Sequence, residues 1–184
     1  IGHEKLKALW NGAFSGCTKL TDVNLTENIS SIGSQAFSGC SSLKTLTIPE
    51  GVTVIPEYAF EDCNYLRVVN LPSTLTTIKD RAFAGCSSMT SASVSGLKTI
   101  GADAFDGCTS LKSIELPDGL TTLGAAAFKN CKALTSINIP YNLGTLYNGT
   151  FEGCEALSKV NYGAYRCSTN GSVFEELNNL TTLY

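Results

Sequence analysis

The chain has 184 residues, of which 43% are apolar and 16% are charged, and its net charge at neutral pH is −3. It can therefore bury a core, and a weak negative charge without any basic run excludes nucleic acid and anionic membrane surfaces as favoured partners. No apolar stretch approaches the roughly 20 residues of a membrane span, so we expect no membrane insertion by this segment.

Phenylalanine marks an internal repeat of 23 residues. All the phenylalanines of the chain follow one another at this spacing, with a single step of 22: Phe14, Phe37, Phe60, Phe83, Phe105, Phe128, Phe151 and Phe174. A fixed period of 20–50 residues is the signature of a solenoid, in which each repeat forms one coil.

Within one coil, the sequence predicts a helical turn, a strand and a second apolar wall, in that order. From Phe37 the unit reads AFSGCSSLKTLTIPEGVTVIPEY. The Ala-Phe to Gly-Cys stretch is interpreted as the helical turn. Leu43, Leu46 and Ile48 then alternate with polar residues, as in a strand, and a proline ends it. Val52 and Ile55 provide the second wall. The strand-ending prolines are Pro49, Pro72, Pro117 and Pro140.

A coil of this kind depends on its neighbours. It orders about 23 residues at roughly 1–2 kcal/mol each of backbone entropy, and its apolar side chains are buried only when coils stack on both sides. We therefore predict right-handed stacked coils, with a parallel β-sheet on one face and short strands and helical turns on the other. About seven to eight repeats are expected.

The repeat is irregular in two places and at its ends. The unit from Phe83 is one residue short, so its loop is expected to tighten at Gly96. The unit from Phe151 places Arg166 and Thr169 where apolar residues belong, which predicts local irregularity. Trp10 stands in a slot that holds glycine in other coils and is expected to cover the first coil. Neither end has an obvious polar cap, so the chain is interpreted as a piece of a longer array.

These units resemble the BspA-like class of leucine-rich repeats. The resemblance rests on the stretches LKTLTIPEGVTVIPEYAFEDCNYL and LKSIELPDGLTTLGAAAFKNCKAL and covers nearly the whole chain. It implies a single leucine-rich-repeat-type solenoid over residues 1–184. It further implies a bacterial protein that is extracellular or attached to the cell surface, with a role in adhesion to host proteins or to other cells.

Seven of the eight cysteines lie three residues after a phenylalanine: Cys17, Cys40, Cys63, Cys86, Cys108, Cys131 and Cys154. Stacked coils place them in one column, where parallel Cα–Cβ vectors suit disulfides poorly. After Phe174 the same slot holds Leu177, which indicates an apolar packing position. We predict a buried, reduced column, with disulfides or a metal as the alternatives, although a linear column without histidine is a poor zinc site. Cys167 lies outside the column.

No catalytic residue, metal ligand or cofactor is predicted. The only histidine, His3, is close to the N-terminus, so no Ser-His-Asp or Cys-His arrangement is available within the array. Glu61, Asp106 and Glu152 share a column, but an intervening coil separates each from the next, which disfavours a paired acid and base. The chain is therefore expected to be non-enzymatic.

The remaining candidates are outward-facing residues. One polar column follows the predicted sheet: Asn24, Thr47, Asn70, Ser93, Glu115, Asn138 and Asn161. Four tyrosines gather in the last two coils: Tyr141, Tyr147, Tyr162 and Tyr165. The column predicts binding of a protein partner across the sheet face, and the tyrosines predict a glycan site. A structural spacer is the third alternative.

The cysteine interpretation predicts a thiol titration. The native protein should have at most about one accessible thiol, that of Cys167, because the column is buried. After denaturation without reductant, close to all eight should react. Few reactive thiols in the denatured protein would mean disulfides.

Overall fold

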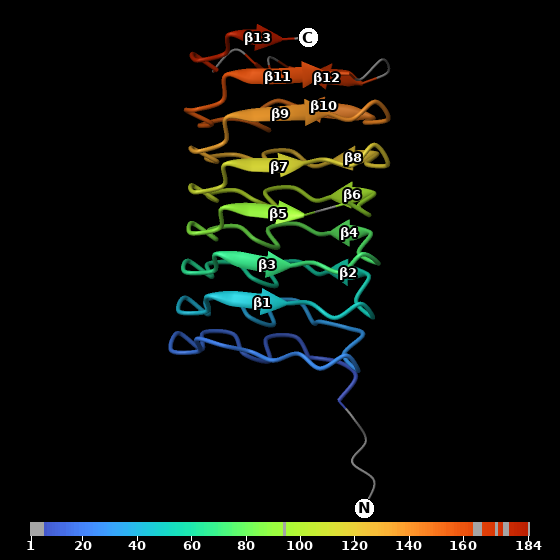
Figure 1. The fold of residues 1–184 in the computed structure, drawn as a ribbon, viewed down its shortest axis with the longest axis vertical. Helices are drawn as coiled ribbons and strands as arrows, with labels where there is room; N and C mark the ends of the chain where they lie inside the picture. The colour runs from blue at the N-terminus through green and yellow to red at the C-terminus, as the bar shows by residue number, and fades with distance from the viewer. Residues whose placement is uncertain (1–5, 94, 164–166, 172, 175–176, 184) are drawn as a thin grey trace, which may run out of the picture.

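The computed structural model describes residues 6–93, 95–163, 167–171, 173–174 and 177–183. Its coils stack along one axis, with the two ends of the chain at opposite ends of the stack (Figure 1). The described residues contain strands and turns but no helix, and therefore no helix able to cross a membrane. The fold is a parallel β-solenoid, as predicted.

One wall of the solenoid is the predicted sheet face. Its strands are β1 (Thr45–Thr47), β3 (Val68–Asn70), β5 (Ser91–Ser93), β7 (Ser113–Glu115), β9 (Ser136–Ile139), β11 (Lys159–Tyr162) and β13 (Thr182–Leu183). They form three parallel groups, β1 with β3, β5 with β7, and β9 with β11 and β13. Within each group the register joins equivalent residues of successive coils, such as Leu46 and Val69. The central residue of most of these strands is buried and its neighbours are exposed, because successive side chains point to opposite faces.

The second wall carries the other strands. These are β2 (Val54–Ile55), β4 (Thr77–Ile78), β6 (Thr99–Ile100), β8 (Thr122–Leu123), β10 (Thr145–Tyr147) and β12 (Ser168–Asn170). The first four form one parallel sheet, and β10 pairs with β12. Thr169 of β12 is exposed opposite the buried Leu146, so the predicted irregularity is present there. Arg166 lies outside the described residues.

The segment predicted as a helical turn is instead a run of tight turns. The N–H groups of Ala36, Ser38 and Cys40 donate to carbonyls three residues earlier in the same coil. The N–H groups between them, including that of Phe37, donate to the next coil; the Phe37 N–H lies 2.8 Å from the Ala59 oxygen. This alternation prevents a helix, because every second donor is used between coils.

Each such run from Phe14 to Phe151 contains two residues in the left-handed region. One is the second residue before the phenylalanine and the other is the second residue after it. Glycine usually holds the second position, as at Gly39 with φ 72°. The first position is glycine in the coils of Phe14 and Phe151, and glutamine, tyrosine, arginine, aspartate or alanine in the coils between them, as at Ala126 with φ 54°. Apart from aspartate, these non-glycine types rarely adopt this conformation.

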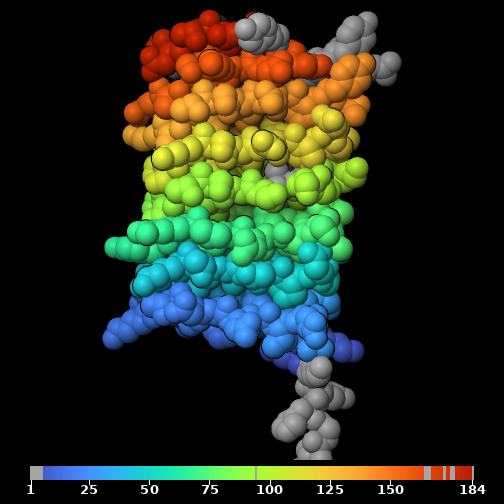
Figure 2. Space-filling model, in the orientation of Figure 1, coloured from blue at the N-terminus to red at the C-terminus, as the bar shows by residue number. Residues whose placement is uncertain are grey.

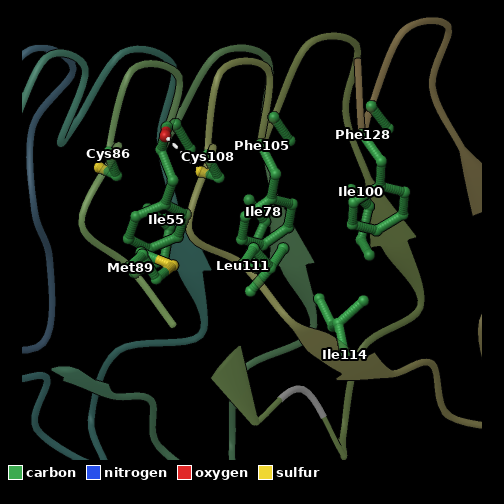
Figure 3. Packing of buried hydrophobic residues seen from close by; sticks show 14 of the residues in the cluster. Ile55, Ile78, Cys86, Met89, Ile100, Phe105, Cys108, Leu111, Ile114 and Phe128 are labelled. Carbon is green, nitrogen blue, oxygen red and sulfur yellow. Dashed lines mark hydrogen bonds between the residues drawn. The ribbon is translucent and has the colours of Figure 1, made fainter. Parts of the chain in front are cut away.

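The phenylalanines form the centre of the core. Neighbouring rings stack nearly parallel, with centroids 5.2–6.4 Å apart. Figure 3 shows how Phe105 and Phe128 point inward beside Ile78 and Ile100 of the second wall and Leu111 of the first. The core therefore runs without interruption through the stack, and no coil has a core of its own.

The short coil tightens at the predicted place. A Cβ atom on Gly96 would lie 2.8 Å from the Ser73 oxygen and 2.9 Å from the Leu75 oxygen. The loop therefore approaches the preceding coil too closely for any other residue.

The left-handed positions lead to a stability prediction. The Ala126→Gly variant should be more stable than the wild type by up to about 1 kcal/mol, because glycine adopts positive φ without strain. The Gly39→Ala variant should lose about 1 kcal/mol for the same reason, since its Cβ would meet only ordinary contacts. Chemical denaturation measures both, and a destabilised Ala126→Gly variant would contradict this explanation.

Candidate functional site

The cysteine column is a hydrogen-bonded part of the core. Cys40, Cys63, Cys86, Cys108, Cys131 and Cys154 are buried and free. The thiol of each donates to the carbonyl of the phenylalanine one coil before its own, at sulfur–oxygen distances of 3.1–3.3 Å. Cys86 and Cys108 lie at equivalent places in successive coils (Figure 3). The same carbonyl accepts the N–H of the cysteine in its own coil, so both lone pairs are used.

Burial makes these thiols unreactive. Loss of contact with water raises the pKa of Cys63 to about 12 and that of Cys154 to about 12. A thiol with such a pKa forms almost no thiolate at neutral pH, and the thiolate is the reactive species. The column therefore packs the core. Leu177 is also buried in its slot, as predicted.

The structure corrects the prediction for the first member of the cysteine column. Cys17 is exposed, although it was expected to be buried with the others. It lies in the first described coil, and no described coil precedes it to cover its thiol. Cys167 is half-buried. The structure therefore predicts two accessible thiols where the sequence predicted at most about one.

The outward column lies on the sheet face, and its members on paired strands are in register. Thr47 pairs with Asn70, Ser93 with Glu115, and Asn138 with Asn161. All seven members, Asn24 included, are exposed. Within the column, the side-chain amide of Asn70 donates to the Thr47 hydroxyl at 3.0 Å. In the space-filling view each coil forms one band across the molecule, and successive bands lie directly on one another (Figure 2).

A hollow of about 500 Å³ interrupts this face across β5 and β7. Ser93 and Glu115 of the outward column line it, with Ser91 and Ser113 beside them. The inward residue at the centre of β5 is Ala92, where the strands on either side have Val69 and Ile114. Val94, which follows β5, lies outside the described residues.

The described C-terminal tyrosines do not converge. Tyr141 follows β9 and is exposed, whereas Tyr147 ends β10 on the second wall. Tyr162 is half-buried, and its hydroxyl donates to the Cys167 carbonyl at 3.0 Å. Burial raises the pKa of Tyr162 to about 12, and its ring meets Phe174 edge-on. Tyr165 lies outside the described residues.

The carboxylates considered for catalysis are paired with neighbouring coils. Glu61 forms an ion pair with Arg81 at 2.8 Å, and Glu152 forms one with Lys129 at 2.8 Å. Asp106 accepts a hydrogen bond from the Asn130 amide. Within the described ranges no three histidine, cysteine, aspartate or glutamate side chains gather in a way that could hold a metal. His3 lies outside those ranges.

The chain belongs to the BspA type leucine-rich repeat family. The sequence model described as the BspA type leucine rich repeat region matches residues 3–96 and 93–184, with six copies. This count is close to the seven to eight repeats predicted from the phenylalanine spacing. A comparison with curated proteins finds no match.

Solved structures of bacterial leucine-rich repeat proteins share the fold. A leucine-rich repeat protein from Bacteroides ovatus is 30% identical with a TM-score of 0.84, and the match covers 91% of this chain and 45% of that one. The T. pallidum leucine-rich repeat protein is 28% identical with a TM-score of 0.76, over 98% of this chain and 74% of that one. This chain is thus a leucine-rich repeat solenoid that spans less than half the length of the Bacteroides relative.

The buried thiols predict a loss of stability at alkaline pH. An unfolded cysteine ionises near pH 9, whereas Cys63 and Cys154 stay protonated in the folded chain up to about pH 12. Above about pH 9 the unfolded state therefore binds fewer protons, and the free energy of unfolding falls by about 1.4 kcal/mol per pH unit for each fully buried thiol. The stabilisation is fully present below pH 9.

Urea denaturation at several pH values between about 8 and 11 measures this slope. Lysine and tyrosine also titrate in this range, so the double variant Cys63→Ala, Cys154→Ala is the control. Its free energy of unfolding should fall less steeply with pH than that of the wild type, by about the contribution of two thiols. Equal slopes would contradict the assignment of the alkaline loss to the column.

Proposed function

We propose that the chain is a non-catalytic protein-interaction module of a bacterial cell-surface or secreted protein, and that its sheet face binds a protein partner. The observation that carries the proposal is the outward column, whose seven members are exposed and whose members on paired strands are in register. Membership of the family supports a repeat module of this kind. The surface location and the role in adhesion follow from the resemblance.

The chemistry of the column suits an extended polypeptide. Asparagine side chains provide both a donor and an acceptor, and serine and threonine hydroxyls provide the same in a shorter form. These short side chains lose little conformational freedom when a partner orders them. Because they stand at coil spacing, about 4.8 Å apart, they offer the partner a continuous row of polar groups. The hollow across β5 and β7 gives the row a recess for a side chain.

The glycan alternative based on the tyrosines has less support. Tyr141 lies in the turn after β9, Tyr147 ends β10 on the second wall, and the hydroxyl of Tyr162 donates to a carbonyl within the chain. A spacer that only projects other domains would need no particular residues in the outward column, so the spacer and the binding module differ in their response to mutation.

Replacement of three column members tests the proposal. On an array of extracellular matrix proteins, the triple variant Asn70→Ala, Asn138→Ala, Asn161→Ala should bind its partner at least about tenfold more weakly than the wild type, because several hydrogen bonds are lost together. Biolayer interferometry on the partners found measures the affinity.

A matched control removes the same side chain from three exposed asparagines outside the column: Asn142, Asn148 and Asn178. This control triple variant should bind like the wild type. Equal binding by both triple variants would contradict a role for the sheet face, and no binding by the wild type to any matrix protein would favour the spacer instead.

A further inference from the structure

Trp10, the only tryptophan of the chain, lies on the surface with 79% of its area exposed. The sequence predicted that it covers the first coil, and the structure corrects this. A large aromatic ring held in solvent by an ordered coil is unusual, because burial of its area would be favourable. The surroundings of Trp10 therefore indicate what its ring contacts in use.

Trp10 stands at the rim of a hollow of about 820 Å³ on the second wall. Successive coils place Trp10, Gly33, Pro56 and Lys79 in the same slot, and all four line the hollow. Gly33 contributes no side chain to the lining, and a Cβ atom there would collide with the backbone of Trp10 and Asn11, so the two coils approach each other closely at this slot. The hollow is thus bounded by an indole on one side and by a proline and a lysine on the other.

A row of fixed polar groups crosses the same hollow. The side-chain oxygen of Asn11 accepts the Ser34 N–H at 2.9 Å, and the Ser34 hydroxyl donates to the Glu57 carboxylate at 3.2 Å. Lys79 donates to the other oxygen of Glu57 at 2.9 Å. These bonds hold an amide, a hydroxyl, a carboxylate and an ammonium group in place, and the two charges cancel.

We propose that this hollow binds a pyranose unit of a glycan. The apolar C–H face of the sugar stacks on the indole of Trp10, and its hydroxyls exchange hydrogen bonds with the row of Asn11, Ser34, Glu57 and Lys79. A sugar hydroxyl both donates and accepts, which matches a row that contains donors and acceptors without net charge. An apolar peptide fits less well, since half of the residues that line the hollow carry hydroxyl, amide or charged groups.

This site is separate from the proposed protein-binding face. The outward column belongs to the sheet wall, whereas the hollow lies on the second wall. Its lining includes Val54 of β2 and Ser31, which pairs with Ala8 in an isolated β-bridge. The two proposals therefore stand or fall independently, and variants of one surface serve as controls for the other.

Fluorescence of the single tryptophan tests the site directly. The wild-type protein is titrated with cello-, malto- and chito-oligosaccharides, with emission excited selectively from tryptophan. Stacking should shift the emission of Trp10 to shorter wavelength and protect it from acrylamide quenching. The effect should saturate with at least one of the three series, and longer oligomers should bind more tightly.

Calorimetry on variants completes the test. Trp10→Ala should lower the affinity for the responding sugar at least about tenfold, and Glu57→Gln severalfold. Tyr65→Ala, which truncates another exposed aromatic residue, should bind like the wild type, as should the sheet-face triple variant. The thermal midpoint of Trp10→Ala should stay unchanged, because the ring contributes little to the core.

Three results would overturn the proposed glycan site. No response of Trp10 to any of the three series overturns the proposal, as does sugar binding that persists undiminished in Trp10→Ala. A response of Trp10 to a matrix protein but to none of the sugars also overturns it, and assigns the hollow to a protein ligand. Loss of protein binding by the sheet-face variant has no bearing on this site.

Discussion

The carbonyl oxygen of each phenylalanine from Phe14 to Phe128 accepts two hydrogen bonds, and the stacking of the coils depends on this pair. For Phe37, one donor is the N–H of Cys40 in the same coil and the other is the thiol of Cys63 in the next coil. A shift in the length of one coil would separate the thiol from its acceptor and leave a buried carbonyl only partly satisfied, which is costly. The pair favours coils of equal length, and it is kept across the single step of 22, where the Cys108 thiol donates to the Phe83 oxygen and the loop tightens at Gly96.

The sequence was sufficient to predict the coil but not all of its turns. Residues such as Phe37 and Leu46 recur at one spacing, so their shared environment could be inferred from the period alone. The left-handed backbone at Tyr58 and Ala126 could not, because neither residue type favours it and the contacts between coils impose it. The exposure of Cys17 was missed because burial was inferred from the column, whereas it depends on the coils that flank each member.

The candidate surfaces were predictable to different degrees. The apolar and polar alternation along the strands is enough to predict that Asn70 and Asn138 face outward, since successive side chains alternate between faces. The hollow at Trp10 was not predicted, because it depends on how the different residues of one slot, Trp10, Gly33, Pro56 and Lys79, lie along the stack. The sequence feature that could have indicated it is the change in this slot from tryptophan in the first coil to glycine in the second. Core positions thus repeat to preserve the stack, and the positions that vary between coils create the distinctive surfaces.

The central claim is that the coils form one cooperative body in which each depends on its neighbours. Native-state hydrogen exchange tests it most directly, through the N–H groups that phenylalanines donate to the next coil, as those of Phe37, Phe60 and Phe105 do. These amides should exchange only when the whole stack unfolds, so each should give the free energy of global unfolding. The N–H of Phe14 in the first coil should exchange faster. Inner coils that exchange separately, each with its own free energy, would contradict this claim.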